Sequence, residues 1–131
     1  MATQVRTDID QLLADSLKEL AAKRPMEKIT IKEITDKAGV IRPTFYNHFQ
    51  DKFELLEWII RTELLEPILP LVRSGMVTEA MVLLFSSIER DKAFYSHVVK
   101  LEGAVTFHDV AQKCVREMLL EIINEQMSGK T

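Results

Sequence analysis

The sequence has 131 residues, of which 47% are hydrophobic and 28% charged, and these proportions are ordinary for a soluble globular protein. No apolar run approaches the roughly 20 residues of a membrane helix, and the start lacks a secretory signal pattern, so we expect a cytoplasmic protein without membrane contact. The single cysteine, Cys114, excludes an intrachain disulfide. The scarcity of glycine and proline, four of each, favours long helices.

Positive charge is concentrated in one stretch of the chain. Residues 23–52 contain seven Lys and Arg against four Asp and Glu, although the net charge of the whole chain is −3. Residues 53–66 contain one Arg and four Glu. This polarity favours a protein that presents one end to phosphates, but a solvated surface of mixed charge explains the same counts equally well.

The first predicted helix begins at Asp8. Apolar residues recur from there at helical spacing as far as Ala21, and Pro25 ends the pattern near Arg24. We expect this amphipathic helix to pack across the two helices that follow.

Residues 30–52 predict two short helices joined by a tight turn. Thr30 and Glu33 form a T-x-x-E capping box, in which each side chain pairs with a backbone N–H of the first turn. Gly39 follows the helix where a left-handed residue is favoured. Pro43 suits the first turn of the second helix, because its missing N–H has no partner there.

The second of these helices has two different faces. Phe45 and Phe49 lie one turn apart on an apolar face, while Thr44, Asn47 and His48 lie on roughly the opposite face. A helix-turn-helix needs this division, since its second helix must be anchored inward and offer polar groups to a major groove.

The run A-G-V-x-x-x-T-F-Y-N-H-F-x-x-K, preceded by I-T-I-K-E-I, resembles the amino-terminal DNA-binding segment of the TetR family of bacterial transcriptional regulators. The resemblance covers about residues 8–60. It implies that Tyr46 and Lys52 contact backbone phosphates and that other residues of the segment lie in or beside the groove. The candidate DNA-binding residues are Thr30, Arg42, Pro43, Thr44, Tyr46, Asn47, His48 and Lys52.

The chain departs from the family pattern before and within the second helix. The family usually has a small polar cap and, two positions later, a small residue, whereas this chain has Ile41 and Pro43. Isoleucine in place of a serine or threonine cap costs about 1 kcal/mol. Arg42 lies off the polar face by angle and reaches DNA through its length. The angle at which this helix would dock on DNA is therefore not predicted.

Further helical signals follow the segment. Asp51 and Glu54 predict the start of a helix beside the recognition helix, and Pro67, Pro70 and Gly75 predict a hinge or bend. Three more helices are expected to begin at about Thr78, Asp91 and Thr106. In the last of them the apolar residues at helical spacing are expected to face a core: Val110, Cys114, Met118, Leu119, Ile122 and Ile123.

These elements predict an all-α fold in two parts. Residues 1–50 form a three-helix DNA-binding head with the helix-turn-helix, and residues 51–131 form a helical ligand-binding and dimerisation part. The resemblance implies an inducer cavity in the second part, although side chains at helical spacing also suit a plain core. The candidate ligand-binding residues are Phe85, Phe94, Tyr95, His97 and Met118.

Relatives of this family usually continue with two more helices that pair across a twofold axis. This sequence stops at Thr131 after one long helix, so we expect either a truncated chain or a short family member. The residues with catalytic potential, His97, His108 and Cys114, are scattered on apolar helices without a supporting motif. We therefore expect no enzyme activity, no metal site and no cofactor.

The sequence predicts a sequence-specific, ligand-responsive transcriptional regulator of TetR type. A homodimer would place two recognition helices in successive major grooves of a near-palindromic operator in double-stranded DNA, and a small-molecule effector would alter their separation. The alternative is a TetR-like protein that has lost DNA reading and acts as a protein-binding coregulator.

Overall fold

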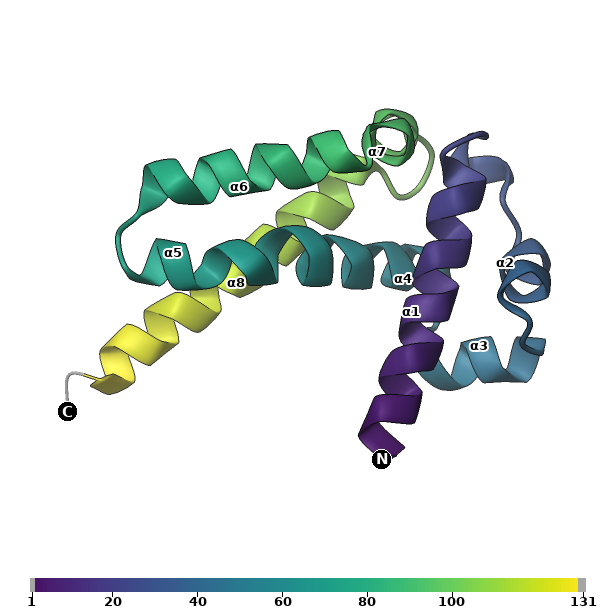
Figure 1. Cartoon of the computed structure of the whole chain (residues 1–131), viewed down its shortest axis with the longest axis horizontal. Coiled ribbons are helices and arrows are strands. Elements are labelled where there is room, and N and C mark those ends of the chain that lie inside the picture. The colour runs from purple at the N-terminus through teal and green to yellow at the C-terminus, as the bar shows by residue number, and fades with distance from the viewer. Residues whose placement is uncertain (1, 130–131) are drawn as a thin grey trace.

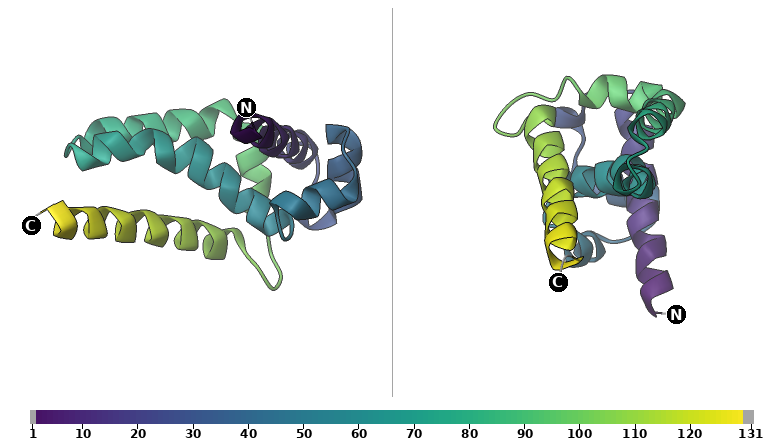
Figure 2. Two further views of the ribbon diagram at one scale, coloured as in Figure 1. Left: turned by 90° about the horizontal axis from the view of Figure 1, so that it is seen from below. Right: turned by 90° about the vertical axis from the view of Figure 1, so that its left-hand side faces the viewer.

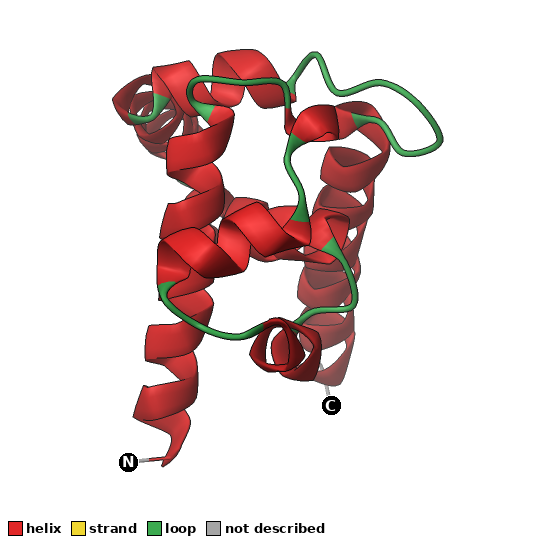
Figure 3. Ribbon diagram, turned by 90° about the vertical axis from the view of Figure 1, so that its right-hand side faces the viewer, coloured by secondary structure: helices red, strands yellow, loops and turns green. Residues whose placement is uncertain are grey.

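The computed structural model describes residues 2–129, with side chains from residue 9 onward, and every regular element in that range is helical. Figure 3 views the molecule from one end and shows helices joined by loops, with no strand among the described residues. Helices without strands confirm the predicted all-α fold.

Three helices form a head at one end of the molecule (Figure 1): α1 (Ala2–Ala21), α2 (Ile31–Ala38) and α3 (Arg42–His48). α1 begins earlier than the start predicted at Asp8. A short 3-10 turn, η1 (Met26–Lys28), follows Pro25 and leads into α2. α1 packs against α2, as the sequence predicts.

The second part, which we call the body, is built on one long rod (Figure 1). The rod consists of α4 (Lys52–Ile59), a π-helical segment η2 (Ile60–Leu65), a 3-10 turn η3 (Glu66–Ile68) and α5 (Leu69–Arg73). Because these segments follow one another without a sharp turn, the rod reaches from the head to the far end of the body.

Three helices surround this rod. α6 (Val77–Arg90) runs back along it, α7 (Lys92–Val98) contacts α1, and α8 (Phe107–Gly129) contacts α4 and η2. Figure 2 shows α8 as a layer of its own beside the rod. The body contacts α1 of the head through α4 and through α7.

The predicted bend occurs at Gly75 and not at the prolines. Pro67 lies in the first turn of η3 and Pro70 in the first turn of α5, and a helix tolerates proline in its first turn. Gly75 has φ of 77°, a left-handed conformation that suits glycine, and it reverses the chain into α6.

The buried apolar side chains of both parts form one continuous cluster. It joins Ile34 and Phe45 of the head to Leu56 and Ile59 of the rod and to Val98 of α7. Burial of this cluster is the main force that holds the head on the body.

α6 and α8 each leave an apolar face in solvent. We call Val77, Met81, Val82 and Phe85 the α6 face, and we call Val115, Leu119, Leu120, Ile123 and Met127 the α8 face. The sequence pattern predicted Leu119 and Ile123 to face a core, but they are 48% and 49% exposed. That prediction is wrong because the rod covers only the side of α8 that carries Val110 and Cys114.

Candidate nucleic-acid interface

The first helix of the helix-turn-helix has the capping pattern that the sequence predicts. The backbone N–H of Glu33 donates to Thr30 Oγ1 at 3.1 Å, and the backbone N–H of Thr30 donates to Glu33 Oε1 at 3.1 Å. Gly39 follows α2 with φ of 77°. These contacts fix both ends of α2, so the direction of the following turn is set locally.

The second helix, α3, begins without a side-chain cap. Ile41 is at the N-cap position, its side chain is 68% exposed, and no cap hydrogen bond forms there. On the inner side of α3, Phe45 is fully buried and Phe49 is 5% exposed. The ring of Phe49 lies 6.3 Å from that of Trp58 on α4, so aromatic packing orients α3 where capping does not.

The outer face of α3 consists of Arg42, Pro43, Tyr46 and Asn47. Tyr46 is 51% exposed. Arg42 lies one turn before Tyr46 and shares its face. Thr44 and His48 are only partly exposed, so the predicted polar face of Thr44, Asn47 and His48 does not form as a unit. The four residues of the outer face are all exposed to solvent instead.

His48 lies against α1 instead of on that outer face. Its Nδ1 is 2.6 Å from Oδ1 of Asp10, and its side chain is only 10% exposed. The contact joins the last residue of α3 to the middle of α1. The structure therefore gives His48 a contact inside the head, and a base contact by this residue stays a prediction.

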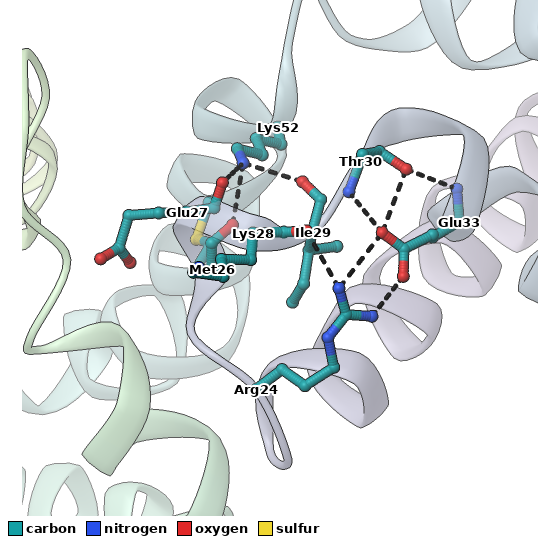
Figure 4. Close-up of polar contacts among 8 residues, drawn as sticks. All are labelled: Arg24, Met26, Glu27, Lys28, Ile29, Thr30, Glu33 and Lys52. Atoms are coloured by element: carbon teal, nitrogen blue, oxygen red, sulfur yellow. Dashed lines mark hydrogen bonds and ion pairs between the residues drawn. The ribbon is translucent and has the colours of Figure 1, made fainter.

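Lys52 also turns inward (Figure 4). Its ammonium donates to the backbone carbonyls of Met26 at 2.8 Å, Glu27 at 3.1 Å and Ile29 at 2.8 Å. Because an ammonium has three protons, these bonds satisfy it fully. Burial lowers the pKa of Lys52 below its ordinary 10.5, and the charges of Glu27 and Glu33 partly offset this effect. In this arrangement Lys52 holds the η1 loop to the start of α4.

A second group of polar contacts lies beside Lys52 (Figure 4). The guanidinium of Arg24 pairs with the Glu33 carboxylate and donates to the Lys28 carbonyl at 3.0 Å. The hydrogen bond from Arg24, followed by those from Thr30, lowers the pKa of Glu33 to about 2. Arg24 and Lys52 thus fix the loop from both sides and place Thr30, which is exposed, at its edge.

The cations of the head differ in how far they are already paired. Lys32 pairs with Asp36 at 2.8 Å and Lys37 with Glu19 at 3.1 Å, and both pairs are exposed. Within residues 9–129, Lys23, Lys28 and Arg42 have no carboxylate within ion-pair distance. These three cations remain available to an anionic partner.

The structure does not gather the candidate ligand residues around one hollow. Phe85 is 64% exposed, while Phe94 and Tyr95 are buried. His97 is half-buried, and its Nδ1 lies 2.9 Å from the Ala93 carbonyl oxygen of its own helix. Met118 lines a groove of about 340 Å³ between the rod and α8, which we call the rod groove. Its lining comes from the rod (Arg61, Leu65, Glu66, Leu69, Arg73) and from α8 (Cys114, Glu117, Met118, Glu121).

Cys114 has the environment of a structural thiol. Its side chain is 2% exposed, its Sγ lies 3.7 Å from the Glu57 carbonyl oxygen, and burial raises its pKa to about 11. A thiol with this pKa is protonated at neutral pH and is a poor nucleophile.

Within residues 9–129, no three His, Cys, Asp or Glu side chains are grouped so as to hold a metal ion. No helix of that described part combines the length and apolar character needed to cross a bilayer.

The contacts that Asp10 makes with α3 and Arg24 makes with α2 were not predicted from the sequence. Asp10 and Arg24 belong to the amphipathic α1 and its end, and at the sequence level they read as ordinary solvent-facing charges. No local motif marks them, because their partners lie in other elements. The capping box, by contrast, is local and is visible in the sequence.

Comparison with known proteins supports the interpretation of the head as a segment that contains a helix-turn-helix. Residues 13–59 match the model of the family described as bacterial regulatory proteins, tetR family. The chain is 26% identical over 92 residues to the HTH-type dhaKLM operon transcriptional activator DhaS of Lactococcus lactis subsp. lactis (strain IL1403). The similar region covers 70% of this chain and 49% of that protein, so the chain spans about half the length of this curated relative.

Proposed function

Because residues 13–59 match the model of the tetR family of bacterial regulatory proteins, we propose that this protein is a cytoplasmic transcriptional regulator that binds double-stranded DNA as a homodimer. The observation that carries the proposal is the division of α3. Its aromatic side is buried, while Arg42, Tyr46 and Asn47 face solvent together.

This outer face has the chemistry that DNA reading requires. Asn47 carries an amide that can bond both N6 and N7 on the major-groove edge of an adenine, and Arg42 can donate two parallel bonds to O6 and N7 of a guanine. Tyr46 carries a hydroxyl that suits a phosphate oxygen. Arg42 has no ion pair within the described part, so no carboxylate must be displaced before it binds. The proposal therefore gives Arg42 and Asn47 base contacts and gives Tyr46 a phosphate contact.

Other candidates lie at the edges of this surface. Thr30 is exposed beside the loop that Lys52 holds, and Pro43 and Thr44 border the outer face of α3. A phosphate contact by Lys52 requires that it release at least one of its three carbonyls. We therefore propose that Lys52 acts first on the loop geometry and only through that geometry on DNA.

The proposed homodimer is based on apolar side chains of the body that are exposed to solvent. The α8 face exposes four large side chains that are 48–68% exposed, namely Leu119, Leu120, Ile123 and Met127. Apolar faces of this kind are buried when two copies of a helix pair. Two paired chains would place their α3 helices roughly 34 Å apart, one turn of the double helix.

A small-molecule effector is the regulatory part of the proposal. The rod groove lies against the π-helical segment and holds Met118, one of the predicted ligand residues. Its volume of about 340 Å³ is in the range of small-ligand pockets. An effector bound there would contact the rod that leads to the head.

One observation favours a second function, a coregulator that binds a protein. The α6 face is apolar, and its Val82 and Phe85 are more than 60% exposed. A patch of this kind is typical of a protein-binding surface. In this alternative the protein would act through a partner and would not read DNA.

Selection of bound duplexes from a random DNA pool at two salt concentrations tests the proposal, with the mass of the protein in solution measured alongside. A dimer that enriches a near-palindromic site and loses affinity steeply with salt is the expected result. The absence of enrichment at low salt, from a folded dimer, would refute DNA reading and favour the protein-binding alternative. A folded monomer without enrichment would instead refute the proposed α8 pairing.

A further inference from the structure

An ion cluster joins the head to two elements of the body. The ammonium of Lys18 on α1 lies 2.6 Å from Glu63 Oε1 on η2 and 2.9 Å from Asp91 Oδ2 between α6 and α7. The three side chains are only 17%, 20% and 32% exposed. We call these three residues the head–body joint.

The joint differs from the exposed ion pairs of the head. Burial lowers the pKa of Lys18, but its hydrogen bonds to Glu63 and Asp91 outweigh that effect, so the pKa is raised above 10.5. Removal of the ammonium would leave two partly buried carboxylates without their counter-charge. Removing one partner of a largely buried ion cluster lowers the free energy of unfolding far more than removing an exposed ion pair does.

Tyr95 adds a polar group with no partner beside this cluster. The residue is 3% exposed, and its hydroxyl has no hydrogen-bond partner within the described part of the chain. Burial, followed by the charges of Glu63 and Asp91, raises its pKa. A buried hydroxyl without a partner lowers the stability of the folded protein, so the packing beside the joint is not optimal for Tyr95.

The joint is linked to the rod groove through η2. Glu63 belongs to the π-helical segment, where the N–H of Glu66 donates to the carbonyl of Arg61. Arg61 and Leu65 of the same segment line the rod groove. Glu63 of the joint and the groove-lining Arg61 and Leu65 thus belong to the same π-helical segment, and such segments are frequent at functional sites.

The joint is also linked to the recognition helix through α1. Asp10, which holds His48, precedes Lys18 by eight residues on the same helix, a separation of about 12 Å along its axis. α1 therefore contacts the body at Lys18 and the end of α3 at Asp10. A rotation of α1 at the joint would therefore also move α3.

We propose that Lys18 is a positioning residue that fixes the angle between head and body, and thereby the separation of the two α3 helices on DNA. The proposal rests on the DNA-binding function proposed above. In this proposal the body influences the orientation of α3 through α1, in addition to the direct connection through α4.

Distance measurement between spin labels tests the joint without DNA. One label is placed on Asn47 of α3 and one on Arg116 of α8, both exposed, in a Cys114→Ser background. Lys18→Met removes the charge and keeps the apolar stem. Lys113→Met is the matched control, because Lys113 pairs with Glu57 at 2.8 Å within the body and does not touch the head.

The expected result is a label distance distribution that broadens or shifts in Lys18→Met and stays unchanged in Lys113→Met. An unchanged distribution in Lys18→Met, or the same change in both variants, would overturn the proposal. If Lys18→Met does not fold, Glu63→Gln serves instead, because it removes one charge and keeps the shape, and the same two outcomes apply.

Unlabelled proteins then test the effect on DNA, with operators whose half-site spacing differs by one base pair. We expect Lys18→Met to lose roughly tenfold in discrimination between these operators, while Lys113→Met keeps it. Unaltered discrimination in Lys18→Met would overturn the positioning role. If the wild-type protein binds no operator, DNA reading fails, whereas a broadened label distance would still uphold the joint.

Discussion

Nδ1 of His48 lies 2.6 Å from Oδ1 of Asp10, so the last residue of the recognition helix is tied to α1. Both side chains are largely covered, at 10% and 23% exposure. α3 has only seven residues and no side-chain cap at its start. Contacts to the rest of the head must therefore set its orientation, and this pair is one of them.

Asp10→Ala and His48→Ala should have the same effect if the pair only positions α3. We expect each change to lower the free energy of unfolding by about 1–2 kcal/mol, because each removes a largely covered hydrogen bond to a charged group. The double variant should be little worse than either single variant, and urea denaturation of all four proteins measures this. A His48→Ala variant that alone loses preference at one base position would instead show that His48 reads DNA.

Tyr46→Phe and Asn47→Ala separate phosphate contact from base reading on the outer face of α3. Loss of the Tyr46 hydroxyl should weaken all duplexes alike, by about tenfold or more, since one hydrogen bond to a charged phosphate oxygen is lost. Loss of the Asn47 amide should relax specificity at one position. Binding to a set of single-base operator variants measures both. A Tyr46→Phe effect confined to particular bases would contradict the phosphate role.

Lys52→Met tests whether this residue acts on the loop or on DNA. The substitution keeps the apolar stem and removes the ammonium that donates to three carbonyls. We expect a loss of about 1–3 kcal/mol in the free energy of unfolding without DNA, because those carbonyls lose their donor. Denaturation of the free protein measures this loss. Unchanged stability together with a salt slope reduced by about one would assign Lys52 to a phosphate.

The stability that Glu33 confers should vanish in acid. Its pKa is about 2 in the folded protein and about 4.5 otherwise, chiefly because Arg24 bonds its carboxylate. The ionised form is thus favoured by folding, so its contribution is full above pH 4.5 and is lost as the pH falls towards 2. Glu33→Gln should be less stable than wild type near pH 6, and the difference should shrink over that window. A difference independent of pH would disprove the role of the charge.

The sequence was most informative where structure depends on near neighbours. The capping box of Thr30 and Glu33, the turn at Gly39 and the uncapped start at Ile41 are all found as predicted. Asp51 accepts the N–H of Glu54 at 2.9 Å, as its D-x-x-E pattern indicates. Each of these features depends on hydrogen bonds within a few residues, and such bonds are fixed by residue type and spacing.

Prediction from the sequence failed where the packing around a helix decides which of its side chains are buried. Periodicity placed Leu119 and Ile123 of α8 towards a core, but it cannot show that only one side of α8 is covered. The same limit applies to His48, whose angle on a helical wheel suited the polar face. At the edge of that face, a partner on α1 decided where the ring lies.

The helical fold, the helix-turn-helix and the aromatic anchor of α3 could all be predicted from residue order, because capping, glycine conformation and apolar spacing act locally. The pairing of polar side chains in the head could not, because it depends on how the helices pack. His48 and Lys52 were predicted to face DNA, and the structure engages both with partners 23–38 residues away in the chain. Charged groups near an interior bond the nearest available partner, and only the packing of the helices determines which partner that is.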